Sequence, residues 1–210
     1  MTSVLAASDA EHLRECMADG GVAVFPTDTV YGLCCDPDNE NAARRLYALK
    51  GRPSARASAV MFFDLQAALE VLGKLGDSER LALRALLPGP VTVLLENDVP
   101  RFPAACRTDP ATLGLRVPAL TERLVALGSL IDPVMQSSAN ISGEPDARSL
   151  AEVPRTILDG VDLVLDGGEL PGTPSTVIDL RDLSSQGRWH LLREGAMARE
   201  AVEQRLAALL

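Results

Sequence analysis

The sequence predicts a mixed α/β (α+β) fold, in which helices flank a twisted, open sheet of mixed strand direction. Three observations support this fold class. Helical and strand patterns interleave along the chain without the strict alternation of an all-parallel fold. Apolar residues make up 47% of the sequence and aromatic residues only 3%, so the core must be aliphatic. A chain of 210 residues is long enough to bury one such core as a single domain.

Capping signals and periodicity predict three helices in the first half of the chain, at residues 8–19, 40–50 and 77–87. Ser8 and Glu11 have the spacing of a capping box, and a glycine pair follows the first of these helices. Asp64 is expected to cap a further helix that begins after it. Apolar runs predict buried strands at residues 22–25, 58–63 and 91–96.

The second half of the chain is predicted to be richer in strands. A short strand is expected at residues 113–117, a helix at 120–127, and a strand at 133–140 that runs into a Ser/Asn-rich loop. Gly/Pro turns separate three late strands, at residues 162–168, 175–180 and 189–195. A C-terminal helix is expected over residues 197–210.

Composition excludes several functional classes. The net charge of −9 argues against a broad basic surface for nucleic acid. No apolar run approaches the roughly 18 residues of a membrane span, and the N-terminus lacks the layout of a signal peptide, so we expect a cytoplasmic protein without membrane contact. The four cysteines form no C-x-x-C pair and neither histidine has metal-ligand spacing, which predicts reduced thiols and no zinc site.

The common catalytic signatures are missing. There is no phosphate-binding P-loop, because Leu75 follows Lys74 where Ser or Thr is required, and two histidines make a Ser-His-Asp triad improbable. Short polar clusters remain at the predicted loop ends. They lie at residues 27–29, 50–52 with Arg56, 88–92, 112–116, 137–140, 175–177 and 193–195.

Each polar cluster has an ordinary structural interpretation. Residues 50–52 suit a helix C-terminus whose cations oppose the dipole, and residues 137–143 suit a Ser/Asn-rich turn. Arg116, inside an apolar strand, is different because a half-buried guanidinium requires an anionic partner. Taken together, the clusters suit a ligand that carries phosphates and a carboxylate.

An ordered series of motifs resembles the YrdC/Sua5 family of threonylcarbamoyl-AMP synthases from about residue 20 to residue 195. Because the motifs are several and in the family's order, the resemblance is highly specific. They are FPTDTVYGL (25–33), the K-x-R of Lys50-Gly51-Arg52, PGPVT (88–92), Ser138-Ala139-Asn140 within SANISG, GGELPGTPSTVIDL (167–180) and LLREGA (191–196).

The resemblance implies a single YrdC-like domain over residues 1–210, with a deep, positively charged groove on the sheet, as in the short form of the family. It implies that L-threonine, bicarbonate and ATP condense to L-threonylcarbamoyl-AMP plus pyrophosphate. Mg²⁺ would bridge the ATP phosphates and require no protein metal site of its own. Threonylcarbamoyl-transfer proteins would then modify the adenosine next to the anticodon of tRNA.

Motif by motif, the resemblance also implies site residues. The catalytic residues would be Lys50, Arg52 and Ser138. L-Threonine would be bound by Thr29, Arg116 and Met61. ATP would be bound by Lys50, Arg52, Arg56, Thr112, Ser138, Asn140 and Arg193. Both motif cations, Lys50 and Arg52, are expected at a helix end, where truncation costs the fold little.

Two residues depart from the family pattern, and two alternatives stay open. Met61 stands where many relatives carry a histidine, and Asp146 where they often carry a hydroxyl residue. One alternative is an enzyme that forms a carbamoyl-adenylate from another carbamoyl donor, as in the homologous domain of hydrogenase-maturation proteins. The other is a non-enzymatic module that binds double-stranded RNA, which the net charge and the few aromatic residues disfavour.

Overall fold

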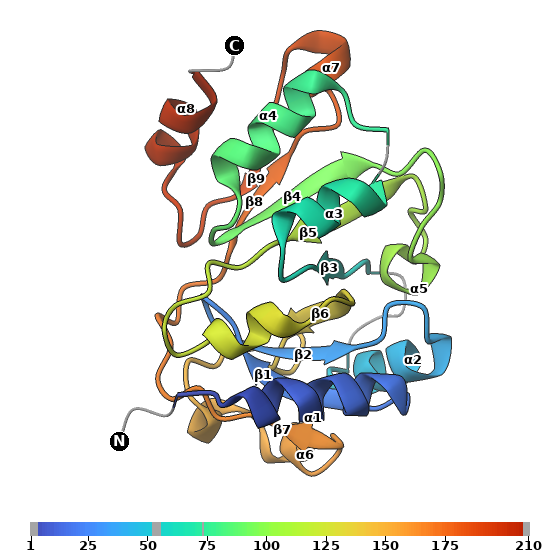
Figure 1. Ribbon diagram of the computed structural model, residues 1–210, viewed down its shortest axis with the longest axis vertical. Coiled ribbons are helices and arrows are strands. Elements are labelled where there is room, and N and C mark those ends of the chain that lie inside the picture. Colours follow the sequence, from blue (N-terminus) through green and yellow to red (C-terminus); the bar gives the residue numbers. More distant parts are fainter. Residues whose placement is uncertain (1–3, 52–55, 73, 208–210) are drawn as a thin grey trace.

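The computed structural model describes residues 4–51, 56–72 and 74–207 of the chain. These ranges contain a nine-stranded sheet in the order β7-β1-β2-β6-β3-β5-β4-β8-β9. Figure 1 shows this sheet between α1, α2 and α6 at its lower end and α4, α7 and α8 at its upper end. The strands are β1 (Val22–Pro26), β2 (Tyr31–Cys35), β3 (Ala59–Met61), β4 (Val91–Glu96), β5 (Thr112–Arg116), β6 (Val134–Ser138), β7 (Leu163–Val164), β8 (Thr176–Asp179) and β9 (His190–Arg193).

Strand direction in the sheet is mixed, as predicted. β7 is parallel to β1, β3 to β5 and β4 to β8, while the other neighbouring pairs are antiparallel. The helices in the described ranges are α1 (Ala7–Ala18), α2 (Glu40–Leu49), α3 (Leu65–Leu72), α4 (Asp77–Leu86), α5 (Pro103–Cys106), α6 (Arg155–Leu158), α7 (Leu183–Gln186) and α8 (Arg199–Ala207), with the 3₁₀ helices η1 (Val125–Ser129) and η2 (Leu150–Glu152). None of them is both long enough and apolar enough to cross a bilayer.

The two faces of the sheet are packed differently. Because successive strand residues point to opposite faces, Val24 and Val60 pack with helices α2 to α5 and α8 in the larger apolar cluster. On the opposite face, Phe25 and Met61 pack with α1 and η1 in a smaller apolar cluster. Polar residues follow along that same face over β4, β5 and β6, and they leave room for a ligand in the middle of the sheet.

Most predicted elements are present, and their ends are set by local contacts. The Asp64 carboxylate accepts from the Ala67 N–H at 2.8 Å, which confirms the predicted cap of α3. The predicted capping box of Ser8 and Glu11 is wrong, because α1 begins one residue earlier. Its first turn is closed by the Asp9 carboxylate, which accepts from the Ala6 N–H at 2.7 Å.

The α-helix predicted at residues 120–127 is also wrong. Leu124, Leu127 and Leu130 are buried at a spacing of three residues, and the N–H of each of the last two donates to the carbonyl of the leucine before it. This is the repeat of a 3₁₀ helix, whose period places every third side chain on one face. The segment therefore forms η1 rather than an α-helix.

Strand β2 was not predicted from the sequence. It pairs with β1 as a hairpin through residues 27–30, and Gly32, its second residue, lies close to two side chains. A Cβ atom at Gly32 would lie 3.0 Å from Phe25 Cε1 and 3.2 Å from Gln136 Nε2, so these side chains would have to shift to make room for it. The glycine thus allows β1, β2 and β6 to pack side by side.

The late segment 167–175 lies against the β1–β2 hairpin. Tyr31 donates its hydroxyl hydrogen to Gly168 O at 2.8 Å and accepts from the Gly167 N–H at 3.0 Å. Burial raises the pKa of Tyr31 to about 12, so this hydroxyl stays protonated. The Gly172 N–H donates to Thr29 O at 2.9 Å. These contacts hold the segment between β7 and β8 against the hairpin.

Thr176, at the start of β8, fixes the segment that follows β9. Its fully buried Oγ1 donates to Met197 O at 2.6 Å and accepts from the N–H groups of Gly195 and Met197, each at 3.0 Å. One hydroxyl is therefore hydrogen-bonded to three backbone groups, two N–H donors and one carbonyl acceptor.

We expect Thr176→Val to lower the free energy of unfolding by about 2–4 kcal/mol, because it leaves buried backbone donors and an acceptor without partners. Thr156→Val, at an exposed helix position, is the matched control and should change stability by no more than about 0.5 kcal/mol. Urea denaturation followed by circular dichroism measures both. Equal stability of the two variants would contradict the role given to the Thr176 hydroxyl.

Candidate active site

A central cavity of about 400 Å³ lies over the middle of the sheet, where β3, β4, β5 and β6 meet the segment around β8 and the end of β9. This volume falls in the range of small-ligand sites, roughly 300–1,000 Å³. The polar residues of its wall are Ser58, Thr92, Asp109, Thr112, Arg116, Gln136, Ser137, Ser138, Asp146, Ser175 and Arg193. Hydroxyl, carboxamide, guanidinium and carboxylate groups together suit a ligand with several charged and hydrogen-bonding groups.

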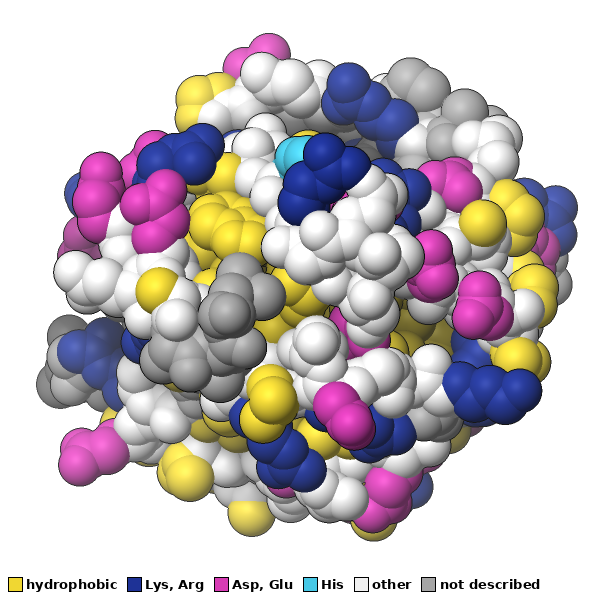
Figure 2. All heavy atoms as spheres, turned by 90° about the horizontal axis from the view of Figure 1, so that it is seen from above, with side chains coloured by type: hydrophobic (Ala, Val, Ile, Leu, Met, Phe, Trp, Pro, Cys, Tyr) yellow, Lys and Arg dark blue, Asp and Glu magenta, His cyan; other side chains and the backbone are white. Residues whose placement is uncertain are grey.

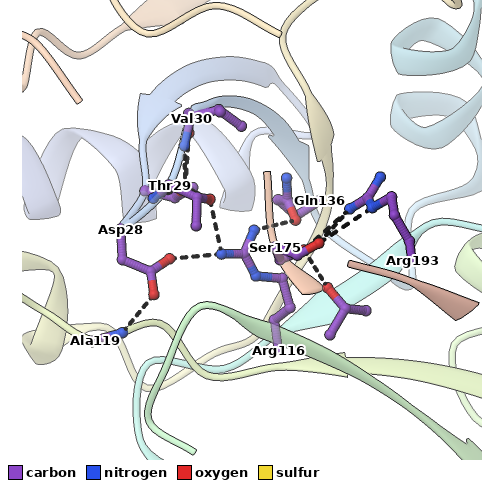
Figure 3. Close-up of polar contacts among 10 residues, drawn as sticks. Asp28, Thr29, Val30, Arg116, Ala119, Gln136, Ser175 and Arg193 are labelled. Atoms are coloured by element: carbon purple, nitrogen blue, oxygen red, sulfur yellow. Dashed lines mark hydrogen bonds and ion pairs between the residues drawn. The ribbon is translucent and has the colours of Figure 1, made fainter. Parts of the chain in front are cut away.

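Arg116, the last residue of β5, is buried in this wall. Its side chain is 3% exposed and forms an ion pair with Asp28, whose side chain is 4% exposed. Nη2 donates to Asp28 Oδ1 at 2.6 Å and to Thr29 Oγ1 at 3.2 Å (Figure 3). Nη1 lies 3.5 Å from Gln136 Oε1, and Nε has no hydrogen-bond partner in the described part of the chain.

Burial dominates the electrostatics of this pair. It lowers the pKa of Arg116 even though Asp28 lies beside it, and it raises the pKa of Asp28 against the effect of Arg116. A buried guanidinium N–H without an acceptor is costly. An oxygen atom of a bound ligand would remove that cost.

Hydroxyl groups hold the turn that carries Asp28. Thr27 Oγ1 donates to Val30 O at 2.7 Å and accepts from the Val30 N–H at 3.3 Å. It also lies 3.0 Å from Thr29 Oγ1. Because the Thr27 hydrogen is directed at Val30 O, the Thr29 hydroxyl is the donor in that contact. Thr29 is fully buried behind Arg116 and accepts from it, and it is not among the residues of the cavity wall.

Lys50 is a buried cation that holds the Ser138–Asn140 loop. Its Nζ donates to Ser138 O, to Asn140 O at 2.9 Å and to Asn140 Oδ1 at 2.8 Å, and its side chain is buried. Ser138 Oγ completes the arrangement by donating to Asn140 Oδ1 at 2.7 Å. Lys50 lies at the end of α2 as predicted, but the expectation that its truncation costs the fold little is wrong because the ammonium is buried and fully used.

Arg193 lies on the opposite side of the cavity from the β1–β2 hairpin. Its Nη2 donates to Ser175 O at 2.8 Å, and Ser175 Oγ lies 2.8 Å from Thr92 Oγ1. No carboxylate in the described ranges forms an ion pair with Arg193, in contrast to Arg116. Its positive charge is therefore available to an anionic ligand.

Thr112, at the start of β5, presents a hydroxyl whose orientation is fixed from outside the cavity. Arg181 Nη1 donates to Thr112 Oγ1 at 2.8 Å, while the rest of that guanidinium pairs with Asp179. The hydrogen bonds from Arg181 lower the pKa of Asp179, so this pair is charged at neutral pH. Because Thr112 Oγ1 is the acceptor in that contact, its hydroxyl hydrogen can be donated to a ligand.

The structure brings together part of the predicted site. Thr112, Arg116, Ser138 and Arg193 lie on the cavity wall. Lys50, Asn140 and Thr29 lie directly behind wall residues, through the hydrogen bonds given above. Met61 is fully buried in the smaller apolar cluster, paired in register with Arg116. Arg56 is exposed and is not a wall residue, and Arg52 lies outside the described residues.

Several residues of the site were given no individual role from the sequence, among them Asp28, Ser175 and Gln136. Asp28 lies between the two threonines of the first motif, and Ser175 precedes the threonine of the STV motif. Gln136 could have been found from alternation, because it shares one face of β6 with Ser138. For Asp28, the sequence carries no signal that its partner is 88 residues away, on another strand.

The wall offers charge and hydrogen bonds rather than a protein nucleophile. Burial raises the pKa of the Cys16 thiol to about 11 and that of Cys35 to about 12, so neither is a reactive thiolate at neutral pH. The described ranges contain no group of three His, Cys, Asp or Glu side chains that could hold a metal ion. The wall carries two arginines and two aspartates, and the predicted positive charge of the groove stays a prediction.

Known proteins match this chain in sequence and in fold. The Sua5/YciO/YrdC family model, described as telomere recombination, matches residues 15–195. A threonylcarbamoyl-AMP synthase of Cellvibrio japonicus is 35% identical over 172 residues, which cover 80% of this chain and 87% of that protein. A threonylcarbamoyl-AMP synthase of Pyrococcus abyssi is 33% identical over 190 residues, which cover 89% of this chain and 54% of that protein.

The fold match extends over nearly the whole chain. The crystal structure of Pyrococcus abyssi Sua5 complexed with L-threonine has a TM-score of 0.83 and 30% identity to this chain, and the match covers 96% of this chain and 58% of that one. The chain thus spans little more than half the length of this relative. The family model covers most of the chain, and the Cellvibrio japonicus enzyme aligns over most of both sequences. The chain therefore belongs to the Sua5/YciO/YrdC family.

Proposed function

We propose that this chain is an L-threonylcarbamoyladenylate synthase, which condenses L-threonine, bicarbonate and ATP to L-threonylcarbamoyl-AMP and pyrophosphate. One observation carries the proposal: a buried arginine with an unpaired Nε, Arg116, shares a cavity with Arg193, which has no carboxylate partner in the described ranges. The first suits a carboxylate and the second suits phosphates. Relatives named threonylcarbamoyl-AMP synthase and a Sua5 complexed with L-threonine support this choice of ligands.

The chemistry suits these wall residues. The threonine amino group and bicarbonate form a carbamate with loss of water, and a carbamate oxygen then attacks the α-phosphorus of ATP while the bond to pyrophosphate breaks. Such a displacement depends on positioning and on stabilisation of charge. It needs no protein nucleophile, and the described wall supplies arginines, hydroxyls, aspartates and one amide for positioning and charge. Mg²⁺ would enter as MgATP, a substrate.

In this proposal each side of the cavity has a separate task. Arg116 contacts the threonine carboxylate, and Arg193, Thr112 and Ser138 contact the nucleotide. Lys50 and Asn140 act as positioning residues, because their hydrogen bonds fix the loop that presents Ser138. Thr29 and Met61 shape the threonine side from behind Arg116. Arg52 and Arg56 are assigned to the triphosphate from the family motif alone.

The product would be transferred to the adenosine beside the anticodon of tRNA by partner proteins in the cytoplasm. We assign no RNA-binding surface to this chain. Figure 2 shows acidic and basic side chains interspersed on the face that it displays, rather than a continuous basic patch, and the net charge is −9. Binding of double-stranded RNA depends on phosphate contacts, which such a surface supplies poorly.

Product identification tests the proposed function. The protein, incubated with MgATP, bicarbonate and L-threonine, should yield threonylcarbamoyl-AMP and equimolar pyrophosphate by mass spectrometry and a pyrophosphate assay. Omission of any one substrate should abolish both. A carbamoyl-adenylate formed from carbamoyl phosphate without threonine would assign the chain to the hydrogenase-maturation type of reaction. RNA binding without ATP turnover would assign it to the non-enzymatic alternative.

Replacement of Arg116 separates the two sides of the cavity. We expect Arg116→Lys to weaken L-threonine binding about 10- to 100-fold, because lysine cannot satisfy Asp28 and a ligand with the fixed geometry of a guanidinium. ATP binding should change by no more than about three-fold, which is less than 1 kcal/mol of binding free energy. Calorimetry with each ligand measures this, and Arg188→Lys, at an exposed position, is the control. Equal losses for both ligands would remove Arg116 from the threonine side.

The two lysines of the chain form a matched pair for the positioning role of Lys50. We expect Lys50→Met to lower the free energy of unfolding by about 2–4 kcal/mol, because it leaves buried acceptors of the Ser138–Asn140 loop unpaired. Turnover should also fall, with a rise in the KM for ATP. Lys74→Met, at an exposed position, should change stability by no more than about 0.5 kcal/mol and leave turnover unchanged. Wild-type stability of Lys50→Met would contradict the structural role.

A further inference from the structure

Asp28 is a buried carboxylate with both of its oxygens in use. Oδ1 accepts from Arg116 Nη2 at 2.6 Å, and Oδ2 accepts from the Ala119 N–H at 3.0 Å (Figure 3). Because its side chain is 4% exposed and that of Arg116 is 3% exposed, solvent does not screen the pair. Arg116 therefore lines the cavity together with its counter-ion, and the pair of side chains carries no net charge.

The contacts of Arg116 restrict how it can bind a ligand. A guanidinium has five N–H donors, and a carboxylate is gripped by two of them along one edge. Either edge that offers two parallel donors, Nε with Nη2 or Nη1 with Nη2, includes Nη2. Asp28 and Thr29 accept from Nη2 at 2.6 and 3.2 Å, so they use its two hydrogens. Only single hydrogen bonds, from Nε or Nη1, remain for a ligand.

The hairpin turn resists displacement of these acceptors. Thr27 and Val30 flank Asp28 and Thr29 in the sequence, and Thr27 Oγ1 is hydrogen-bonded to both the N–H and the carbonyl of Val30. The Gly172 N–H holds Thr29 O at 2.9 Å from the other direction. A ligand carboxylate that replaced Asp28 would also leave the Ala119 N–H without its acceptor.

We propose that Asp28 is a positioning residue that makes Arg116 a single-donor, charge-neutralised contact, so that the cavity binds a carboxylate only when the same ligand makes further contacts. The assignment of that ligand as L-threonine rests on the proposed function. Simple carboxylates are excluded because one hydrogen bond from a neutralised arginine holds them weakly. The amino and hydroxyl groups of an amino acid supply the remaining affinity. Asp28 thereby contributes to ligand selection without contacting the reacting atoms.

Two substitutions open different edges of Arg116. Asp28→Asn removes the negative charge and replaces one of the two acceptor oxygens, which serve Arg116 and Ala119, by an amide nitrogen that cannot accept. Thr29→Val keeps the ion pair and the side-chain shape but removes the acceptor on the edge that Nη2 shares with Nη1. Asp38→Asn makes the same change of charge as Asp28→Asn at an exposed position and is the matched control.

The probe is propanoate, compared with L-threonine in NMR titrations of each folded protein. We expect propanoate to bind each of the two variants about ten-fold or more tighter than the wild type, the effect of one charge-assisted hydrogen bond. The preference for L-threonine over propanoate should fall by a similar factor. Asp38→Asn should behave as the wild type. A general loosening of the fold would weaken both ligands and would not raise propanoate binding.

The outcomes separate this proposal from the proposed function. If both folded variants bind propanoate no more tightly than the wild type, or if neither shows measurable binding, the role of Asp28 is wrong. If Asp28→Asn lacks a cooperative thermal transition, Thr29→Val decides, because unchanged propanoate binding in it would overturn the single-donor contact that the proposal assigns to Arg116. If the wild type makes no threonylcarbamoyl-AMP, the proposed function fails, while the propanoate comparison still judges how Asp28 sets the contacts of Arg116.

Discussion

The ion pair between Arg116 and Asp28 connects parts of the sheet that are not neighbours. Arg116 ends β5, whereas Asp28 lies in the turn between β1 and β2, and strands β6 and β3 separate the two in the sheet order. Removing both charges from water costs several kcal/mol per ion, which the pair recovers only with good geometry and further hydrogen bonds. Thr29, Ala119 and Gln136 supply these bonds. The turn between β1 and β2 is therefore held against the end of β5, beside the central cavity that Val30 lines.

A second buried cation closes the neighbouring part of the same cavity. Lys50 reaches from the end of α2 to the loop after β6, where backbone and side-chain oxygens receive its protons. Lys50 is used wholly inside the protein, to orient a loop, whereas Arg116 orients a turn and also lines the cavity with an unpaired Nε. The guanidinium of Arg193, bound to Ser175 oxygens, keeps its charge for the cavity. Burial thus divides basic residues that look equivalent in sequence into framework and ligand-facing groups.

Strands could be predicted from the sequence, whereas the partners of the buried charged residues could not. Apolar runs located β1, β4, β5 and β6, since burial of a strand leaves a direct pattern, and some residues of the polar motifs, Thr92, Thr112 and Ser138, line one cavity. The burial of Lys50 depends on Asn140 and the pairing of Asp28 depends on Arg116, contacts 90 and 88 residues apart that no local pattern encodes. Strand β2 was missed because its role depends on Gly32 fitting between Phe25 and Gln136, again a tertiary requirement.

The contrast between the two lysines has a practical consequence. In the folded protein the only exposed side-chain amine belongs to Lys74, because the sequence has no other lysine and Lys50 is 2% exposed. An amine-reactive dye at mildly alkaline pH should therefore attach to Lys74 among the side chains and leave Lys50 unmodified. Acylation of Lys50 would require the Ser138–Asn140 loop to come away from α2. The ratio of label on the two peptides, read by mass spectrometry, would then report how often that side of the cavity opens in solution.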